Sequence, residues 1–188
     1  VDHSPYKALL ENEVARLISY LRKKFDIDLK LKKLSIFNVV IGEENVPKDQ
    51  PVLYIPNHRS YFDILLIYSR VPGLTGFVSK DSMQKFYLLR DWMKKLHCLF
   101  LNRENPREGL KTILQGIENI KNGISMCIFP EGTRNKVDEM MPFKEGSLKM
   151  AEKTGCLVIP VALSNTAEIF ENHIPWLRPC NVVIEYGT

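Results

Sequence analysis

The chain has 188 residues and a mass of 21.7 kDa, and 45% of its residues are hydrophobic. These values fit one ordinary globular domain and exclude a disordered chain or a fibrous repeat. The chain has 26 basic and 22 acidic residues, so its net charge of +4 is too small to indicate binding to nucleic acid through charge alone. Most of the excess positive charge lies between Arg16 and Lys33, a stretch with seven basic and two acidic residues.

The cysteines and histidines give little sign of redox or metal chemistry. No C-x-x-C pair and no cluster with metal-ligand spacing occurs, so we expect four buried, reduced thiols in a cytosolic setting and no metal site. The residues concerned are Cys98, Cys127, Cys156, Cys180, His3, His97 and His173. No apolar run approaches the 18 residues of a membrane span, so nothing in these residues is expected to cross a bilayer. Because the chain opens with Val1, we expect one or both ends of the natural protein to be missing.

The hydrophobic pattern predicts an amphipathic helix with a basic end over residues 6–25, followed by alternating strands and helices. The predicted strands are 36–41, 52–56, 76–79, 98–101, 125–129, 157–161 and 182–186, and the predicted later helices are 61–70, 87–96, 106–122 and 145–154. This alternation favours an α/β fold with a mixed, mostly parallel sheet flanked by helices. We predict a single domain over 1–188, made of an amphipathic, basic segment at 1–35 and an α/β core at 36–188.

A polar turn follows the predicted strand at 52–56. His58 lies in this turn, and Ser60 is expected to cap the next helix with Asp63 at its third position. A turn that runs into a first helical turn can bring the Asp63 carboxylate beneath the His58 imidazole. With no Ser or Cys nucleophile evident beside it, such a pair suits a general base that accepts a proton from a substrate hydroxyl. A purely structural hydrogen bond is the alternative interpretation.

A second motif, Glu131-Gly132-Thr133-Arg134, also follows a predicted buried strand. Gly132 lets backbone N–H groups approach a ligand, Thr133 adds a hydroxyl, and Arg134 offers a planar fork that matches phosphate oxygens. The pattern indicates an anion cradle, although a plain turn with a surface arginine fits it equally well. Two more cations, Lys80 and Arg103, follow other predicted strands.

Ligands of open α/β sheets bind outside the carboxyl ends of the strands. His58, Lys80, Arg103 and Arg134 are each predicted to lie at such an end. We therefore expect them to converge on one pocket for a phosphorylated compound that carries a hydroxyl group.

Four blocks, in order and in spacing, resemble the motifs of the glycerolipid acyltransferases, with the closest likeness to the bacterial 1-acylglycerol-3-phosphate acyltransferases. The blocks are Asn57-His58-x4-Asp63, Phe100-x2-Arg103, Phe129-Pro130-Glu131-Gly132-Thr133-Arg134 and Val158-Ile159-Pro160-Val161. The resemblance spans about 36–186 and implies transfer of a fatty acyl group to the sn-2 hydroxyl of lysophosphatidic acid, which yields phosphatidic acid.

The resemblance also implies a role for each site residue. His58 corresponds to the general base and Asp63 to the residue that orients the imidazole. The residues that hold the glycerol phosphate would be Arg103, Glu131, Gly132, Thr133 and Arg134, while Lys80 would help with the phosphate or the oxyanion.

No cofactor is implied, because acyl-CoA or acyl-acyl-carrier protein serves as the co-substrate. The lipid acceptor implies a membrane surface as partner and the cytoplasmic face of a bacterial inner membrane as location, with the segment at 1–35 as one possible contact. An acyl-carrier protein is a further possible partner, and nucleic acid is not expected. Many relatives carry N-terminal membrane helices, and this chain departs from that pattern.

Three alternatives stay open at this point. The acceptor could be glycerol 3-phosphate or another lysophospholipid, because the motifs position a phosphate and a hydroxyl without fixing the rest of the molecule. The chain could also be a lipid-binding or acyl-carrier-binding module without turnover, although an intact pair of His58 and Asp63 argues against this. No sequence pattern indicates a preferred acyl-chain length or an oligomeric state.

Overall fold

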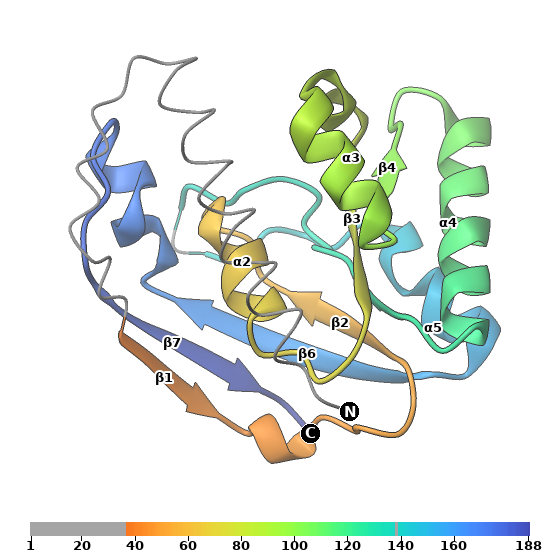
Figure 1. The fold of residues 1–188 in the computed structure, drawn as a ribbon, viewed down its shortest axis with the longest axis horizontal. Helices are drawn as coiled ribbons and strands as arrows, with labels where there is room; N and C mark the ends of the chain where they lie inside the picture. The colour runs from red at the N-terminus through yellow and green to blue at the C-terminus, as the bar shows by residue number, and fades with distance from the viewer. Residues whose placement is uncertain (1–36, 138) are drawn as a thin grey trace.

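The structure is a computed structural model that describes residues 37–137 and 139–188 (Figure 1). The predicted helix at 6–25 and the basic stretch from Arg16 to Lys33 lie outside the described residues. Among the described residues, no helix is both long enough and apolar enough to span a membrane.

Seven strands form one sheet in the order β1-β7-β6-β2-β5-β3-β4. Their bounds are β1 Phe37–Ile41, β2 Val52–Pro56, β3 Thr75–Lys80, β4 Leu99–Leu101, β5 Ser125–Cys127, β6 Leu157–Ser164 and β7 Asn181–Tyr186. All neighbours are parallel except β6 and β7, which run antiparallel. The predicted mixed, mostly parallel sheet is therefore confirmed.

The helices lie in the predicted places. They are α2 Phe62–Tyr68, α3 Tyr87–Lys95, α4 Pro106–Lys121 and α5 Lys149–Thr154, with short 3-10 turns η1 Glu43–Asn45, η2 Asp81–Lys85, η3 Glu145–Leu148, η4 Thr166–Ile169 and η5 Glu171–His173. α4 shows why the sequence pattern worked, because Asn105 Oδ1 accepts hydrogen bonds from the N–H groups of Arg107 and Glu108 and Pro106 occupies the first helical position.

The core has one cluster on each face of the sheet. Ile67 of α2 and Met93 of α3 belong to the first cluster, and Ile117 of α4 and Met150 of α5 belong to the second. β2 is buried along its whole length and sends alternate side chains into the two clusters. This central strand, covered on both faces, is a rigid base for the turn that follows it.

Three details differ from the sequence prediction. β5 ends at Cys127, because the chain turns at Gly132, whose φ is 75° and whose N–H donates to the carbonyl of Phe129. The helix predicted at 145–154 divides into η3 and α5. All four cysteines are free, but Cys156 and Cys180 are only half-buried, so the expectation of four buried thiols is wrong for these two.

Candidate active site

Four neighbouring strands deliver the predicted site residues to one edge of the sheet. β2, β5, β3 and β4 are adjacent and parallel, so their carboxyl ends meet at the same edge. His58 follows β2, Lys80 ends β3, Arg103 follows β4, and Arg134 lies in the loop after β5. In Figure 1 that loop and η4–η5 gather beyond the arrowheads of β2 and β6.

His58 and Asp63 form the predicted pair. His58 Nδ1 lies 2.8 Å from Asp63 Oδ2, and the same oxygen accepts hydrogen bonds from the N–H groups of Arg59 at 2.7 Å and Ser60 at 2.8 Å. Asp63 is fully buried, and its Oδ1 has no hydrogen-bond partner among the described residues. When Nδ1 carries the hydrogen and donates it to the carboxylate, Nε2 of His58 has the lone pair that can accept a proton.

The helix after this pair begins slightly later than predicted. Tyr61, rather than Ser60, occupies the N-cap position of α2, so Asp63 is the second helical residue. Ser60 Oγ still accepts a hydrogen bond from the N–H of Phe62 at 3.0 Å. Because His58 and Ser60 both precede α2, the Asp63 carboxylate points back past the start of the helix to contact them.

The loop after β5 holds His58 in place from three sides. The Phe129 ring stacks on the imidazole with centroids 4.0 Å apart, and the N–H of Asn135 donates to the His58 carbonyl at 2.7 Å. Glu131 Oε1 accepts a hydrogen bond from the His58 N–H at 3.2 Å. The main-chain N–H and carbonyl of His58 are therefore both held by hydrogen bonds, and the Phe129 ring packs against its imidazole.

Glu131 faces the protein interior in this structure. The residue is only 1% exposed, and its second oxygen accepts hydrogen bonds from Asn135 Nδ2 at 3.0 Å and the Met141 N–H at 3.2 Å. The sequence placed Glu131 among the phosphate-holding residues. Its carboxylate instead accepts hydrogen bonds from the turn of His58 and from the loop after β5, so it holds these two segments together.

Gly132 and Arg103 lie against each other. A Cβ atom on Gly132 would lie 3.4 Å from Arg103 Nη1, and the positive φ of Gly132 also favours glycine. Burial lowers the pKa of the Arg103 guanidinium from its ordinary value, but arginine keeps its charge in proteins. Thr133 is exposed on the same loop, so the cradle presents a cation, a backbone turn and a hydroxyl.

Arg134 is already engaged by two neighbours. Its Nη2 donates to the Tyr61 hydroxyl at 2.8 Å, and its guanidinium lies 3.6 Å from the centroid of the Tyr61 ring. Its Nη1 donates to Glu171 Oε1 at 3.3 Å. Lys80, by contrast, is exposed, and within residues 37–137 and 139–188 no hydrogen bond or ion pair joins it to the other site residues.

The model of the family described as Acyltransferase matches residues 38–164, more than half of the chain. The chain belongs to the acyltransferase family. It is 32% identical over 157 residues to the 1-acyl-sn-glycerol-3-phosphate acyltransferase of Borreliella burgdorferi, with 84% of this chain and 63% of that protein covered. It is 35% identical over 133 residues to the enzyme of the same name from Saccharomyces cerevisiae, with 69% of this chain and 44% of the yeast protein covered.

A solved structure has the same fold as this chain. The crystal structure of the 1-acyl-sn-glycerophosphate acyltransferase PlsC from Thermotoga maritima matches with a TM-score of 0.69 and 29% identity, and the match covers 82% of this chain and 61% of that one. The chain thus spans less than two thirds of each of these three relatives.

Two residues of the chain have structural roles that the sequence analysis missed. Asn57 joins the turn after β2 to β6, because its Oδ1 accepts from the Leu163 N–H at 2.7 Å and its Nδ2 donates to the Leu163 carbonyl at 3.0 Å. The place of Asn57 beside His58 was the available signal. Glu171 contacts Arg134 and the turn after β2 from η5, where no local pattern marked it.

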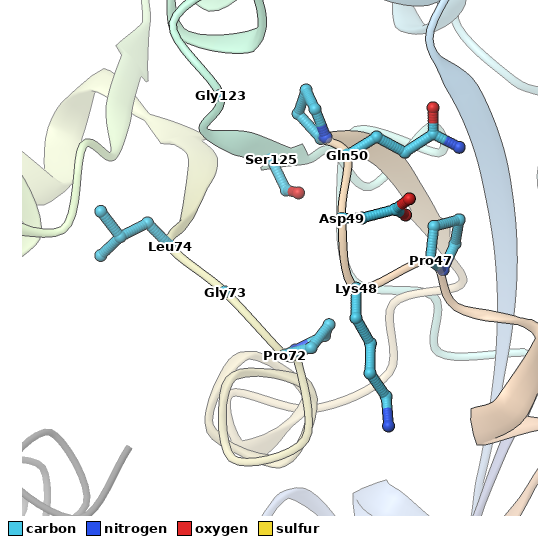
Figure 2. Close-up of a pocket in the computed structure, with 10 residues that line it drawn as sticks. Pro47, Lys48, Asp49, Gln50, Pro72, Gly73, Leu74, Gly123 and Ser125 are labelled. Carbon is cyan, nitrogen blue, oxygen red and sulfur yellow. The ribbon is translucent and has the colours of Figure 1, made fainter. Parts of the chain in front are cut away.

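A pocket of about 160 Å³ lies at the opposite edge of the sheet (Figure 2). It is lined by residues that precede β2, β3 and β5 and by the first residue of β5, namely 47–51, 72–74, Gly123 and Ser125. Ser125 Oγ accepts a hydrogen bond from the Val52 N–H, so this hydroxyl helps join β5 to β2. The amino ends of the strands therefore form a hollow remote from His58.

Proposed function

We propose that the chain transfers a fatty acyl group from a thioester to the sn-2 hydroxyl of 1-acylglycerol 3-phosphate, which yields phosphatidic acid. The activities for which its relatives are named support this acceptor. The observation that carries the proposal is the 2.8 Å contact of His58 with buried Asp63, at the same edge of the sheet as Arg103 and Arg134.

His58 is the general base in this proposal. Its Nε2 accepts the hydroxyl proton while the substrate oxygen attacks the thioester carbonyl carbon, and a placed base of this kind contributes roughly 10²- to 10⁴-fold. The carbon–sulfur bond then breaks, the thiolate leaves, and the proton on His58 passes to the sulfur. Asp63 stabilises the imidazolium, and its charge acts strongly because it is withdrawn from water. No covalent enzyme intermediate is needed.

Arg103 and the loop of Gly132, Thr133 and Arg134 bind the acceptor phosphate. Each charge-assisted hydrogen bond contributes about 1.5 to 3 kcal/mol, and together they point the acceptor hydroxyl at His58. Lys80 supplies a further cation, either to the phosphate or to the oxyanion of the tetrahedral intermediate.

The donor is acyl-CoA or acyl-acyl-carrier protein, and no cofactor takes part. The acceptor remains in the bilayer because each buried methylene contributes about 0.8 kcal/mol, so the chain works at a membrane surface. The proposed location is the cytoplasmic face of a bacterial inner membrane.

Thiol release from an acyl thioester in detergent micelles tests the proposal. We expect release with lysophosphatidic acid as acceptor and its loss in His58→Ala. His97→Asn is the matched control, since it removes a histidine at the end of α3 and suits the positive φ of 56° at that position.

Three results would change the proposal. Release only with glycerol 3-phosphate would keep the mechanism and change the acceptor. Full activity in His58→Ala would remove His58 from the mechanism, and a folded chain that binds lipid without turnover would be a binding module.

A further inference from the structure

Glu171 lies between the proposed base and the proposed phosphate-binding arginine. Its Oε2 accepts a hydrogen bond from Ser60 Oγ at 2.7 Å, and its Oε1 accepts one from the Tyr61 N–H at 2.7 Å. The same Oε1 contacts Arg134 Nη1 at 3.3 Å. One carboxylate therefore holds both the turn of the base and the guanidinium.

We propose that Glu171 is a positioning residue for acyl transfer, one that aims Arg134 at the acceptor phosphate and couples phosphate binding to the turn that carries His58. This inference rests on the proposed function. It adds a residue from η5, which lies beyond the residues 38–164 that the family model matches.

The geometry fixes the plane of the guanidinium. The Tyr61 ring lies 3.6 Å from Arg134 Cζ, the Tyr61 hydroxyl accepts from Nη2, and Glu171 accepts from Nη1. A guanidinium has five N–H donors, so three remain for a phosphate after these two bonds. The ordering of a long, flexible side chain before the ligand arrives lowers the entropy that binding must overcome.

The coupling to the base runs through a short, buried path. The hydroxyl of Ser60 donates to Glu171, and the N–H of Ser60 donates to Asp63 Oδ2, the oxygen that also contacts His58. Ser60 is fully buried, while the Glu171 side chain is 15% exposed and that of Arg134 is 32% exposed. The guanidinium is the part of this chain of contacts that a ligand can reach.

Steady-state kinetics with lysophosphatidic acid and an acyl thioester test the inference. We expect Glu171→Ala to raise the KM for the acceptor about 10-fold, in the range of measured pair couplings, and to leave the KM for the donor unchanged. Glu171→Gln keeps an oxygen acceptor, so we expect a rise of about threefold. In an Arg134→Ala background, neither substitution should raise the acceptor KM further.

Glu168→Gln is the matched control. Glu168 is an acid of the neighbouring η4 that bonds His173 and Asn172 and makes no recorded contact with the turn of His58 or with Arg134 among the described residues. We expect its kinetics to equal those of the unsubstituted chain. If Glu171→Ala does not fold, the comparison with Arg134→Ala is made with Glu171→Gln.

Titration with glycerol 3-phosphate in the absence of donor separates the two proposals. The inference is supported if Glu171→Ala weakens binding of glycerol 3-phosphate in the otherwise unsubstituted chain and causes no further weakening in the Arg134→Ala background. This holds even when the chain shows no turnover. Equal increases in the KM of donor and acceptor, or effects that add to those of Arg134→Ala, would overturn it and leave Glu171 a structural support. Normal turnover in Glu171→Ala would overturn the inference and leave the proposed function intact.

Discussion

Asp63 is the most constrained residue of the site. One of its oxygens receives three contacts, from His58 Nδ1 and from the N–H groups of Arg59 and Ser60. The other oxygen is buried with no partner among the described residues. A carboxylate that is held in one place and kept from water fixes the tautomer of the imidazole more firmly than a solvated one.

We expect Asp63→Asn to lower kcat for acyl transfer by at least about 100-fold, because the amide cannot hold the tautomer or stabilise an imidazolium. The measurement is single-turnover thiol release, with the KM for lysophosphatidic acid determined alongside. Little change in the acceptor KM is expected, since Asp63 is buried away from the phosphate cradle. A kcat near that of the unsubstituted chain would show that the pair is structural.

At the scale of elements, β3 packs tightly against the segment that leads into β4. A Cβ atom on Gly76 would lie 2.3 Å from the main-chain oxygen of His97, so no side chain fits there without moving the backbone. This close approach brings the start of β3 against the residue that precedes Cys98 and β4.

Gly76→Ala is expected to lower the free energy of unfolding by about 1 to 3 kcal/mol, because the added methyl overpacks a buried strand. Urea unfolding followed by circular dichroism measures this change. Gly73→Ala is the matched control, since a Cβ atom there meets nothing within 4 Å. Equal effects of the two substitutions would contradict the packing argument.

The elements themselves were readable from the sequence for physical reasons. Short apolar and β-branched runs predicted β2 and β7, and the cap, proline and apolar stripe predicted α4 almost to the residue. Local patterns carry no information about which strands become neighbours, so the contact between Tyr61 and Glu171, 110 residues apart, could not be foreseen. The inward orientation of Glu131 was hidden for the same reason, because one of its partners, His58, lies 73 residues away in the turn after β2.

At the scale of the whole molecule, buried thiol and tyrosine hydroxyl groups, which are neutral when protonated, are expected to lower the free energy of unfolding at alkaline pH. Burial raises the pKa of the Cys98 thiol from 9.0 to about 11 and that of the Tyr186 hydroxyl from 10.0 to about 12. Above pH 9 the unfolded chain releases these protons first, so the folded state binds more protons. The contribution of these two groups to the free energy of unfolding should therefore be constant below about pH 9 and fall as the pH rises toward 12.

Urea unfolding at a series of pH values from neutral upward measures this fall. Cys98→Ala should lessen the fall between pH 9 and 11, since it removes one of the buried thiols whose pKa is raised. An unchanged curve would mean that other groups determine alkaline unfolding.

The proposed membrane contact places one edge of the molecule against lipid. The site lies at the carboxyl ends of the strands, and Tyr61, Ile174 and Trp176 are exposed on segments that meet there or follow η5. Trp176 is 57% exposed, whereas Trp92 packs against the core. Tryptophan at a bilayer surface reports its position through its fluorescence.

In a Trp92→Phe variant we expect the emission of Trp176 to shift to shorter wavelength on addition of phospholipid vesicles and to be quenched by brominated lipid. The chain has two tryptophans, so this variant reports on Trp176 alone. Vesicle binding without a change in emission would mean that another face meets the membrane.

The position of β5 also governs when the site can form during synthesis. β5 lies between β2 and β3, although both of these strands precede it in the chain. The hydrogen bond from Asn135 to the carbonyl of His58 cannot exist until the ribosome has released Asn135. His58 is therefore held in its final orientation only after the residues up to Asn135 have emerged, and a nascent chain that stops before β5 carries His58 without the contacts that orient it.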